Sequence, residues 1–357
     1  MRPVLLFLIC AALALTACGG DDASDEKTPA APKTSGQDLG AIKTYLLDHT
    51  DRLSTDVATL KENAQRYHDL AEQSGFDTEK MLADNQDEVA KLLGDAKQTF
   101  VDANPAYEEM EGVVAGVPSL ADFDVIIDAG SDASDPESAV PFSIKTEDGK
   151  TFKQPGNLFF LVESSLYGTE PKWSSKGDVD GDGKVAFGEA LPEPRFYLAS
   201  LEEFDKQAKQ LDASAQKWTP TEQDAMTALV VMTPTMSEYF EAWKNSRFIA
   251  GDKATEKSFV GASRLQDIAD ILGGLKLIYA SVQPKIEEAD KQQAAQTGKS
   301  LSELEAFAAR LRDQEAGGKK FTAEDADTLG GEAQDRAEAI AGQVTQAAKQ
   351  LNIDLET

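Results

Sequence analysis

The chain has 357 residues, which is enough for one large domain or two ordinary ones with a substantial hydrophobic core. Its 63 acidic and 35 basic side chains give a formal net charge of −28. Such a surface repels the phosphate backbone and attracts cations, so it argues against nucleic acid as a partner. Solubility alone is a sufficient explanation of the charge, because net charge does not specify a fold.

The N-terminal residues predict export and a lipid anchor. Arg2 precedes an apolar run at residues 4–15 that is short for a membrane-spanning helix but typical of a signal peptide. The following Leu15-Thr16-Ala17-Cys18 resembles a bacterial lipobox. We therefore expect residues 1–17 to be cleaved and Cys18 to carry acyl chains that hold the protein on a membrane, in the periplasm or at the cell surface. A plain secretory signal is the alternative.

Cysteine usage then limits the chemistry of the mature protein. Cys10 leaves with the signal peptide and Cys18 is consumed by the lipid, so no thiol remains. This excludes a disulfide, a zinc-thiolate site and a cysteine nucleophile. Residues 18–38 are mostly small or charged and contain Gly and Pro, which predicts a flexible tether between the lipid and the folded domain.

Apolar residues at three- and four-residue steps predict an all-α domain over residues 39–352. Capping signals favour a helix start at Thr219, Pro220 and Glu222, a kink at Pro234 and a final helix that Thr322 and Asp325 cap. The helices that we expect run over residues 42–70, 78–101 with an end near Pro105, 106–114, 258–288, 301–315 and 322–351.

The middle of the chain differs from its flanks. Residues 117–200 hold most of the prolines, aspartates and glycines, which predicts an irregular insertion in the helical domain. Within it, residues 142–146 and 150–152 flank Asp148-Gly149, a sequence typical of a small β-hairpin with a tight turn.

Residues 178–189 match the calcium-loop pattern of EF-hand type without a mismatch. Calcium is a hard cation that takes six to eight oxygen ligands at about 2.3–2.6 Å. Gly183 permits the backbone reversal, and Ala186 leaves the ninth position to a water molecule. The predicted ligands are the carboxylates of Asp178, Asp180, Asp182 and Glu189, and the carbonyl of Lys184.

The surroundings of this loop predict a structural role for the calcium ion. Pro171, Pro192 and Pro194 make long flanking helices unfavourable, and the sequence holds no second loop to pair with this one. A structural site is therefore expected rather than a calcium switch. A solvated acidic turn that binds nothing tightly is the alternative.

The sequence offers little for catalysis, and we expect no enzyme. Its two histidines, His49 and His68, fall on one predicted helix about 28 Å apart. The chain has no H-E-x-x-H motif for zinc and no G-x-S-x-G nucleophile elbow.

Several segments resemble the imelysin family, in particular its iron-uptake lipoprotein (EfeO-type) members. The resemblance spans roughly residues 40–350 and implies an imelysin-like double helical bundle, here with an irregular central insertion that carries the calcium loop. The segments that carry it are Ala106–Gly112, Leu120–Asp124, Ile127–Ala129, Asn157–Gly168, Ser263–Ile268 and Gly273–Tyr279.

The family has an H-x-x-E motif that is implicated in metal binding. Glu163 matches its glutamate, but Phe160 stands in the place of the histidine. A remaining second metal site would use oxygen ligands alone, which suit Ca²⁺, Mg²⁺ or Fe³⁺. Its candidate ligands are Glu163, Glu108, Glu111 and Asp267, with Asp124 and Asp128 as further acids. A salt bridge or a helix cap is the alternative role for each of them.

Three hypotheses follow for function, and the third of them is a hydrolase that would have to use His49 or His68. In the first, the protein captures a metal, with iron as the transported ligand, and delivers it to an inner-membrane permease or another envelope protein. In the second, it is a calcium-stabilised interaction or scaffold lipoprotein that has lost the metal site of the family, as Phe160 suggests.

Overall fold

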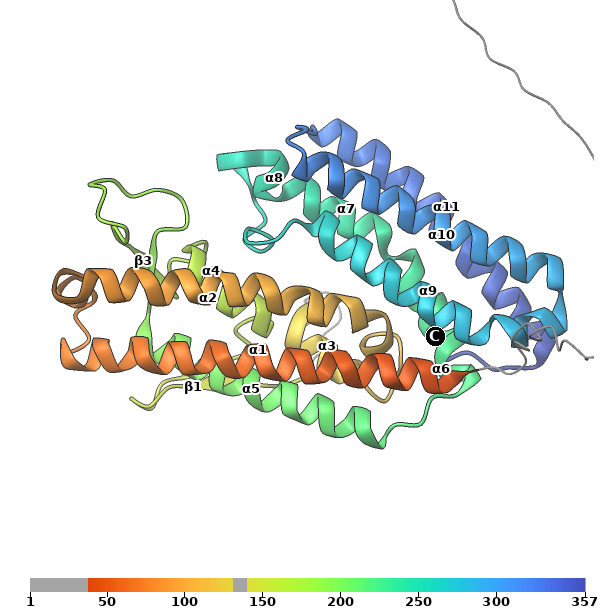
Figure 1. Ribbon diagram of the computed structural model, residues 1–357, viewed down its shortest axis with the longest axis horizontal. Coiled ribbons are helices and arrows are strands. Elements are labelled where there is room, and N and C mark those ends of the chain that lie inside the picture. The colour runs from red at the N-terminus through yellow and green to blue at the C-terminus, as the bar shows by residue number, and fades with distance from the viewer. Residues whose placement is uncertain (1–37, 131–139, 357) are drawn as a thin grey trace, which may run out of the picture. The chain divides into compact units, whose positions relative to one another are not determined.

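The computed structural model describes residues 38–130 and 140–356 (Figure 1). These residues are mostly helical, and the strands among them form two small antiparallel sheets. The predicted all-α fold class is therefore confirmed. The predicted signal peptide, the tether up to residue 37 and the lipidation site Cys18 lie outside the described residues.

The N-terminal half is built on three long helices that lie side by side (Figure 1). α1 packs along both α2 and α5, and the short α4 covers α5. The bounds are α1 Leu39–Gln73, α2 Thr78–Val114, α4 Leu158–Tyr167 and α5 Pro194–Lys217.

The C-terminal half is a second group of helices, joined to the first mainly by contacts of α9 with α2. In it, α9 packs along α10, and α11 packs against α7, α6 and α10 (Figure 1). The bounds are α6 Glu222–Met232, η2 Thr233–Thr235, α7 Met236–Asn245, α8 Arg247–Ala250, η3 Gly251–Lys253, α9 Arg264–Ala289, α10 Lys291–Ala316 and α11 Ala323–Leu351.

The segment between α2 and α5 contains short elements. It starts with α3 Ala121–Asp124 and the π-helical turn η1 Val125–Ala129. Strands β1 Ser143–Lys145 and β2 Thr151–Lys153 then form the predicted hairpin, with Ile144 opposite Phe152. Strands β3 Ser174–Lys176 and β4 Ala190–Pro192 pair at the two ends of the predicted calcium loop.

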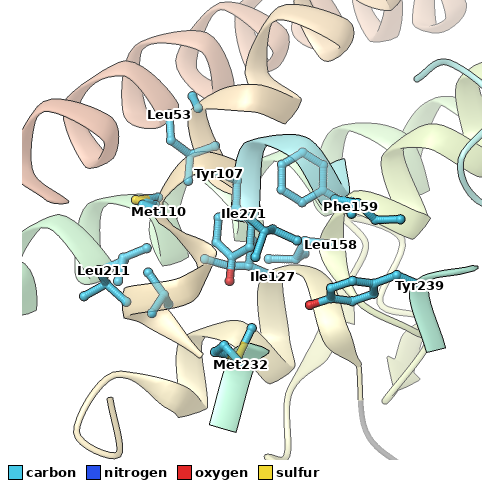
Figure 2. Packing of buried hydrophobic residues seen from close by; sticks show 14 of the residues in the cluster. Leu53, Tyr107, Met110, Ile127, Leu158, Phe159, Leu211, Met232, Tyr239 and Ile271 are labelled. Atoms are coloured by element: carbon cyan, nitrogen blue, oxygen red, sulfur yellow. The ribbon is translucent and has the colours of Figure 1, made fainter. Parts of the chain in front are cut away.

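Apolar side chains from both halves meet in one continuous core. The N-terminal half contributes Leu53 on α1, Met110 on α2 and Leu211 on α5, and the C-terminal half contributes Met232 on α6 and Ile271 on α9 (Figure 2). This shared core fixes α9 against the second half of α2, which is where polar side chains also gather.

Two predicted helix ends were wrong. Pro105 does not end the second helix, because buried residues on both sides of it, Ala103 and Tyr107 among them, keep α2 continuous to Val114. The helix expected from Ser258 starts only at Arg264, since backbone N–H groups of the preceding loop bind a distant carboxylate instead of continuing a helix.

Two helix starts were also displaced. α6 is capped by Thr221 and Asp224, whereas Thr219 and Glu222 were predicted to cap it. α10 begins at Lys291 rather than near residue 301. Asp290 accepts the backbone N–H groups of Gln292 and Gln293 and so supplies the earlier start. The cap of α11 by Thr322 and Asp325 and the break of the α6–α7 segment at Pro234 are confirmed.

Within the described residues, we find no helix that combines the length and the apolar character needed to cross a bilayer.

Candidate metal site

Acidic side chains from four elements converge beside the core. Glu108 and Glu111 lie one turn apart on α2 and therefore share a face. Asp124 ends α3, Asp128 belongs to η1, and Asp267 lies in the first turn of α9. We call these five residues the acidic cluster. One carboxylate oxygen from each of Glu108, Glu111 and Asp128 lies within 4.8 Å of the other two, a spacing that allows them to share a cation.

Arg264 supplies the positive charge in contact with the acidic cluster. Its guanidinium donates to Asp267 at 3.1 Å and approaches Glu108 at 3.4 Å. The same group lies over the rings of Tyr239, at 4.3 Å, and Phe259, at 4.5 Å. One arginine thus faces several buried carboxyl groups, and it cannot balance all of them if they are ionised.

Neutral donors satisfy part of the acidic cluster. Tyr107 donates to Asp124 at 2.6 Å, Asn104 donates to Asp267 at 2.7 Å, and Tyr239 donates to Glu111 Oε1 at 3.0 Å. Nine buried side-chain polar atoms of the described residues lack a hydrogen-bond partner, and two of them belong to the acidic cluster and its arginine: Oε2 of Glu111 and Nε of Arg264. Unsatisfied buried groups of this kind are costly and call for an explanation, such as a bound ligand.

A pocket of about 410 Å³ opens on these residues. Its wall includes Glu111, Asp124, Asp128, Asn157, Tyr239 and Arg264. Asn157 caps α4 by accepting the N–H of Phe160 at 2.7 Å and also donates to the carbonyl of Asp128, so it fixes η1 against α4. The unpartnered oxygen of Glu111 and the unpartnered nitrogen of Arg264 thus belong to residues of one pocket.

Burial dominates the acid–base behaviour of the acidic cluster. It raises the pKa of Asp128 to about 7, and it raises the pKa values of Glu108, Glu111, Asp124 and Asp267 above their ordinary range. The charge of Asp267 adds to the rise for Glu108, whereas Arg264 opposes it. The acidic cluster therefore binds protons more readily than exposed carboxyl groups do, and a bound cation would compete with these protons.

Glu163 lies apart from this arrangement of ligands. Both of its oxygens are engaged, because they accept the backbone N–H groups of Phe259 at 2.8 Å and of Val260 and Gly261 at 2.9 Å each. Burial nevertheless raises its pKa to about 7. Glu163 thus fixes the loop in which Phe259 lies, and Phe259 forms part of the pocket wall. If Glu163 bound a metal, it would have to give up these hydrogen bonds. Phe160 packs against the core and has no oxygen or nitrogen in its side chain to offer.

The second candidate site is the loop over residues 178–189. One oxygen each from Asp178, Asp180 and Asp182 lies within 4.8 Å of the others. Asp178 accepts the N–H groups of Gly181 at 2.9 Å and Gly183 at 3.0 Å, where φ is +76° and +84°. These positive φ values are the reason that glycine is needed at both positions.

The far end of this loop folds back on its start. Glu189 Oε1 accepts the N–H groups of Val179 at 3.2 Å and Asp180 at 3.3 Å, so its carboxylate lies inside the loop. From α2, Gln86 donates to the carbonyl of Asp178 at 2.9 Å and Lys97 donates to that of Gly188 at 2.6 Å. The loop is therefore fixed to the helical domain at both ends. Its flanks are the strands β3 and β4, in agreement with the expected lack of long flanking helices there.

The acids of the pocket were predicted from the sequence, whereas Arg264 and Tyr239, which organise them, were not. Arg264 lies within Ser263–Ile268, one of the segments that resemble the family, but nothing in that segment indicates its role. A buried arginine next to Asp267 and 156 positions from Glu108 becomes recognisable only when the helices are packed together.

Comparison with known proteins agrees with the helical architecture. The family model described as imelysin, which also carries a peptidase designation, matches residues 41–351. No curated protein matches the chain. Since the match covers most of the sequence and all the long helices of the structure, the chain belongs to the imelysin family.

Proposed function

We propose that this protein binds a metal cation in the acidic cluster and captures it at the cell envelope for uptake, with iron as the transported metal. The observation that carries the proposal is the convergence of Glu108, Glu111 and Asp128. Of these, Glu111 and Asp128 line one pocket, and Oε2 of Glu111 has no partner among the described residues. Carboxylate oxygens are hard ligands and favour hard cations such as Fe³⁺, Mn²⁺ and Mg²⁺.

The acid–base properties of the acidic cluster support reversible binding of a cation without a covalent step. Carboxyl groups whose pKa values are raised by burial can exchange a proton for a cation, so binding would be reversible and sensitive to pH. No step of bond making or breaking is needed. This agrees with the expectation that the protein is not an enzyme, and we propose no peptidase activity.

We further propose that the loop at residues 178–189 binds calcium and stabilises the fold. The ligands would be Asp178, Asp180, Asp182, the carbonyl of Lys184, and Glu189. The proximity of the three aspartates and the inward position of Glu189 support this set. α2 holds the loop at Asp178 and Gly188 through hydrogen bonds. The same helix carries Glu108 and Glu111, so bound calcium would also stabilise the helix that positions these two ligands.

Cell-envelope capture requires export and anchoring. We propose that residues 1–17 are removed and that acyl chains on Cys18 hold the protein on a membrane, in the periplasm or at the cell surface. The captured metal would pass to an inner-membrane permease or another envelope protein. Mass spectrometry of the mature N-terminus tests this step directly: an unmodified N-terminus, or one that starts elsewhere than Cys18, would contradict it.

Calorimetric titration tests the metal site. Mn²⁺, Mg²⁺ and ferric citrate are titrated separately into the calcium-saturated chain from residue 19, which retains the whole compact unit of residues 36–357. We expect saturable binding of at least one of these ligands, with proton release that appears as a dependence of the heat on the buffer. Glu111→Gln should weaken that binding by about tenfold or more, because a charged ligand is lost without a change of shape.

Glu238→Gln is the matched control, since Glu238 lines the same pocket but is exposed at its edge. It should leave the affinity nearly unchanged. A lack of saturable binding beyond calcium in the unaltered chain would contradict metal capture.

A calcium-stabilised scaffold lipoprotein is the second candidate function. The observation that favours it is Arg264, which already places a positive charge against Glu108 and Asp267. Phe160 also stands at the position of the family histidine. In this reading, the guanidinium of Arg264 takes the place of the metal cation. Failure of the titration above would favour this reading.

A further inference from the structure

We infer that the pocket binds its metal as a chelate with a small anionic carboxylate, and that Arg264 recognises the anion. This inference rests on the proposed capture of a metal cation and names the chemical form of its ligand. Two polar atoms of the pocket residues lack partners among the described residues, and they are of opposite kinds. Oε2 of Glu111 is an acceptor that suits a cation, whereas Nε of Arg264 is a donor that suits an anion.

Tyr239 holds these two groups in place. Its hydroxyl donates to Glu111 Oε1 at 3.0 Å, and its ring stacks on the Arg264 guanidinium at 4.3 Å. The residues that carry the acceptor and the donor therefore both contact one side chain. A ligand that presents a cation to Glu111 and an oxyanion to Arg264 would satisfy both at the same time.

Arg264 has donors to spare for such a contact. One terminal nitrogen serves both Asp267 and Glu108, at 3.1 Å and 3.4 Å, while Nε makes no hydrogen bond within the described part of the chain. A guanidinium presents its N–H groups in a planar fork that matches a carboxylate. Phe259 and Tyr239 stack on the guanidinium and fix the direction of the fork.

The size of the pocket also favours a chelate over a bare ion. A volume of about 410 Å³ lies within the range of small-molecule sites, whereas one water molecule occupies only about 30 Å³ of liquid. A single cation bound to Glu108, Glu111 and Asp128 would leave most of this space to solvent. A small di- or tricarboxylate can fill it and complete the coordination shell of the metal.

The charge balance points the same way. The acidic cluster has five carboxyl groups against Arg264, so a free organic anion alone is disfavoured there. The metal in a chelate offsets that repulsion. The proposed site therefore discriminates against citrate without metal as well as against metal without citrate.

The test compares ligands on the unaltered, calcium-saturated chain from residue 19. The probes are Mn²⁺ alone, Mn²⁺ with citrate, ferric citrate, ferric acetohydroxamate and citrate alone. Each is measured by calorimetry with free calcium held at the same saturating concentration in the cell and the syringe, because citrate also chelates calcium. The hydroxamate keeps iron soluble but carries no carboxylate. We expect each citrate chelate to bind about tenfold or more tightly than its carboxylate-free counterpart, and citrate alone to bind weakly or not at all.

Arg264→Lys then isolates the anion contact, because lysine retains the charge but loses Nε and the planar fork. It should remove the advantage of citrate, so that the ratio of the affinities for Mn²⁺ with and without citrate falls to about one. Circular dichroism and the melting temperature establish whether this variant is folded. If it is unfolded, the comparison of ligands on the unaltered chain still decides whether the pocket prefers a citrate chelate.

The outcomes separate this inference from the proposed function. Equal binding of Mn²⁺ with and without citrate, and of the two ferric chelates, would overturn the anion contact while metal capture stands. Equally tight binding of citrate alone would also overturn it. Binding of none of the probes would overturn metal capture and the chelate with it.

Discussion

The carboxylate of Glu163 accepts the backbone N–H of Gly261 at 2.9 Å across 98 positions of sequence. The same carboxylate accepts the N–H groups of Phe259 and Val260, and thereby ties α4 to the loop that precedes α9. Phe259 has a φ of +55°, which is uncommon for a residue with a side chain, and its ring contacts Arg264. A single buried acid therefore holds a strained loop that forms one wall of the pocket.

Glu163→Gln should destabilise the protein by about 1–3 kcal/mol at neutral pH. The variant replaces one carboxylate oxygen by an NH₂ group, which cannot accept a hydrogen bond from the backbone N–H that this oxygen binds. Urea unfolding monitored by circular dichroism measures the change. Glu170→Gln is the matched control: Glu170 pairs with Lys257 of the same loop, but this pair lies near the surface. We expect the control to cost less than about 1 kcal/mol. Equal losses for the two variants would contradict a special role for Glu163.

The pKa of Glu163 predicts how stability depends on pH. Burial raises this pKa from 4.5 to about 7, so the folded state binds the proton more tightly than the unfolded state does. The stability that the proton contributes is complete below about pH 4.5 and is lost as the pH rises through about 7. The metal-free protein should therefore lose stability over this interval. Glu163→Gln should reduce this dependence of the free energy of unfolding on pH. If the dependence is unchanged in the variant, other groups cause it.

Calcium should raise the melting temperature of the protein if the loop at residues 178–189 binds the ion only in the folded state. At a calcium concentration of 100 times the dissociation constant, the gain is about 2.7 kcal/mol. Asp178→Ala should abolish the calcium-dependent increment measured by scanning calorimetry. Asp313→Asn serves as the control, because Asp313 is exposed and pairs with its neighbour Arg312. Full retention of the increment in Asp178→Ala would remove this residue from the proposed ligands.

The sequence predicted what depends on local pattern. The period of apolar residues indicated the long helices, Thr322 with Asp325 marked the start of α11, and Asp148-Gly149 marked the hairpin turn. The geometry of residues 178–189 could also be anticipated, because all the groups involved lie within twelve positions.

Interactions between distant segments could not be anticipated in the same way. The helix was expected to begin at Ser258, since nothing nearby shows that Glu163 captures the N–H groups of the loop. The partner of Arg264 on α2 is 156 positions away, so the acidic cluster was predicted as a list of acids without its arginine. Pro105 favours a helix end by its own chemistry, and the continuity of α2 depends on tertiary packing.

Arg264→Met should be among the most destabilising substitutions in the chain. It leaves Glu108 and Asp267 buried without their positive partner, which costs about 3–5 kcal/mol for a broken buried ion pair. The loss should be smaller at pH 5 than at pH 7.5, since protonation of the two acids removes the unpaired charge. Asp267→Asn in the same chain should restore part of the stability. Urea unfolding at both pH values measures this, and a loss that is independent of pH would indicate a packing defect instead.

The last prediction concerns Phe160, where the family pattern has a histidine. Phe160→His restores the H-x-x-E spacing with Glu163, on one face of α4. We expect no new site for Zn²⁺ or Cu²⁺, and a change in their affinity of less than about threefold. Both oxygens of Glu163 already accept backbone N–H groups, and Phe160 is not part of the pocket wall that the described residues form.

Competition with a chromogenic chelator measures the Zn²⁺ affinity, and Phe160→Leu controls for the loss of packing. Zinc binding that appears in the histidine variant, is absent from the leucine variant and disappears in the double variant with Glu163→Gln would contradict this prediction. In that case Glu163 would exchange its hydrogen bonds with the loop for a metal. Metal binding would then also release Phe259 from its strained conformation and alter the contact that this residue makes with Arg264.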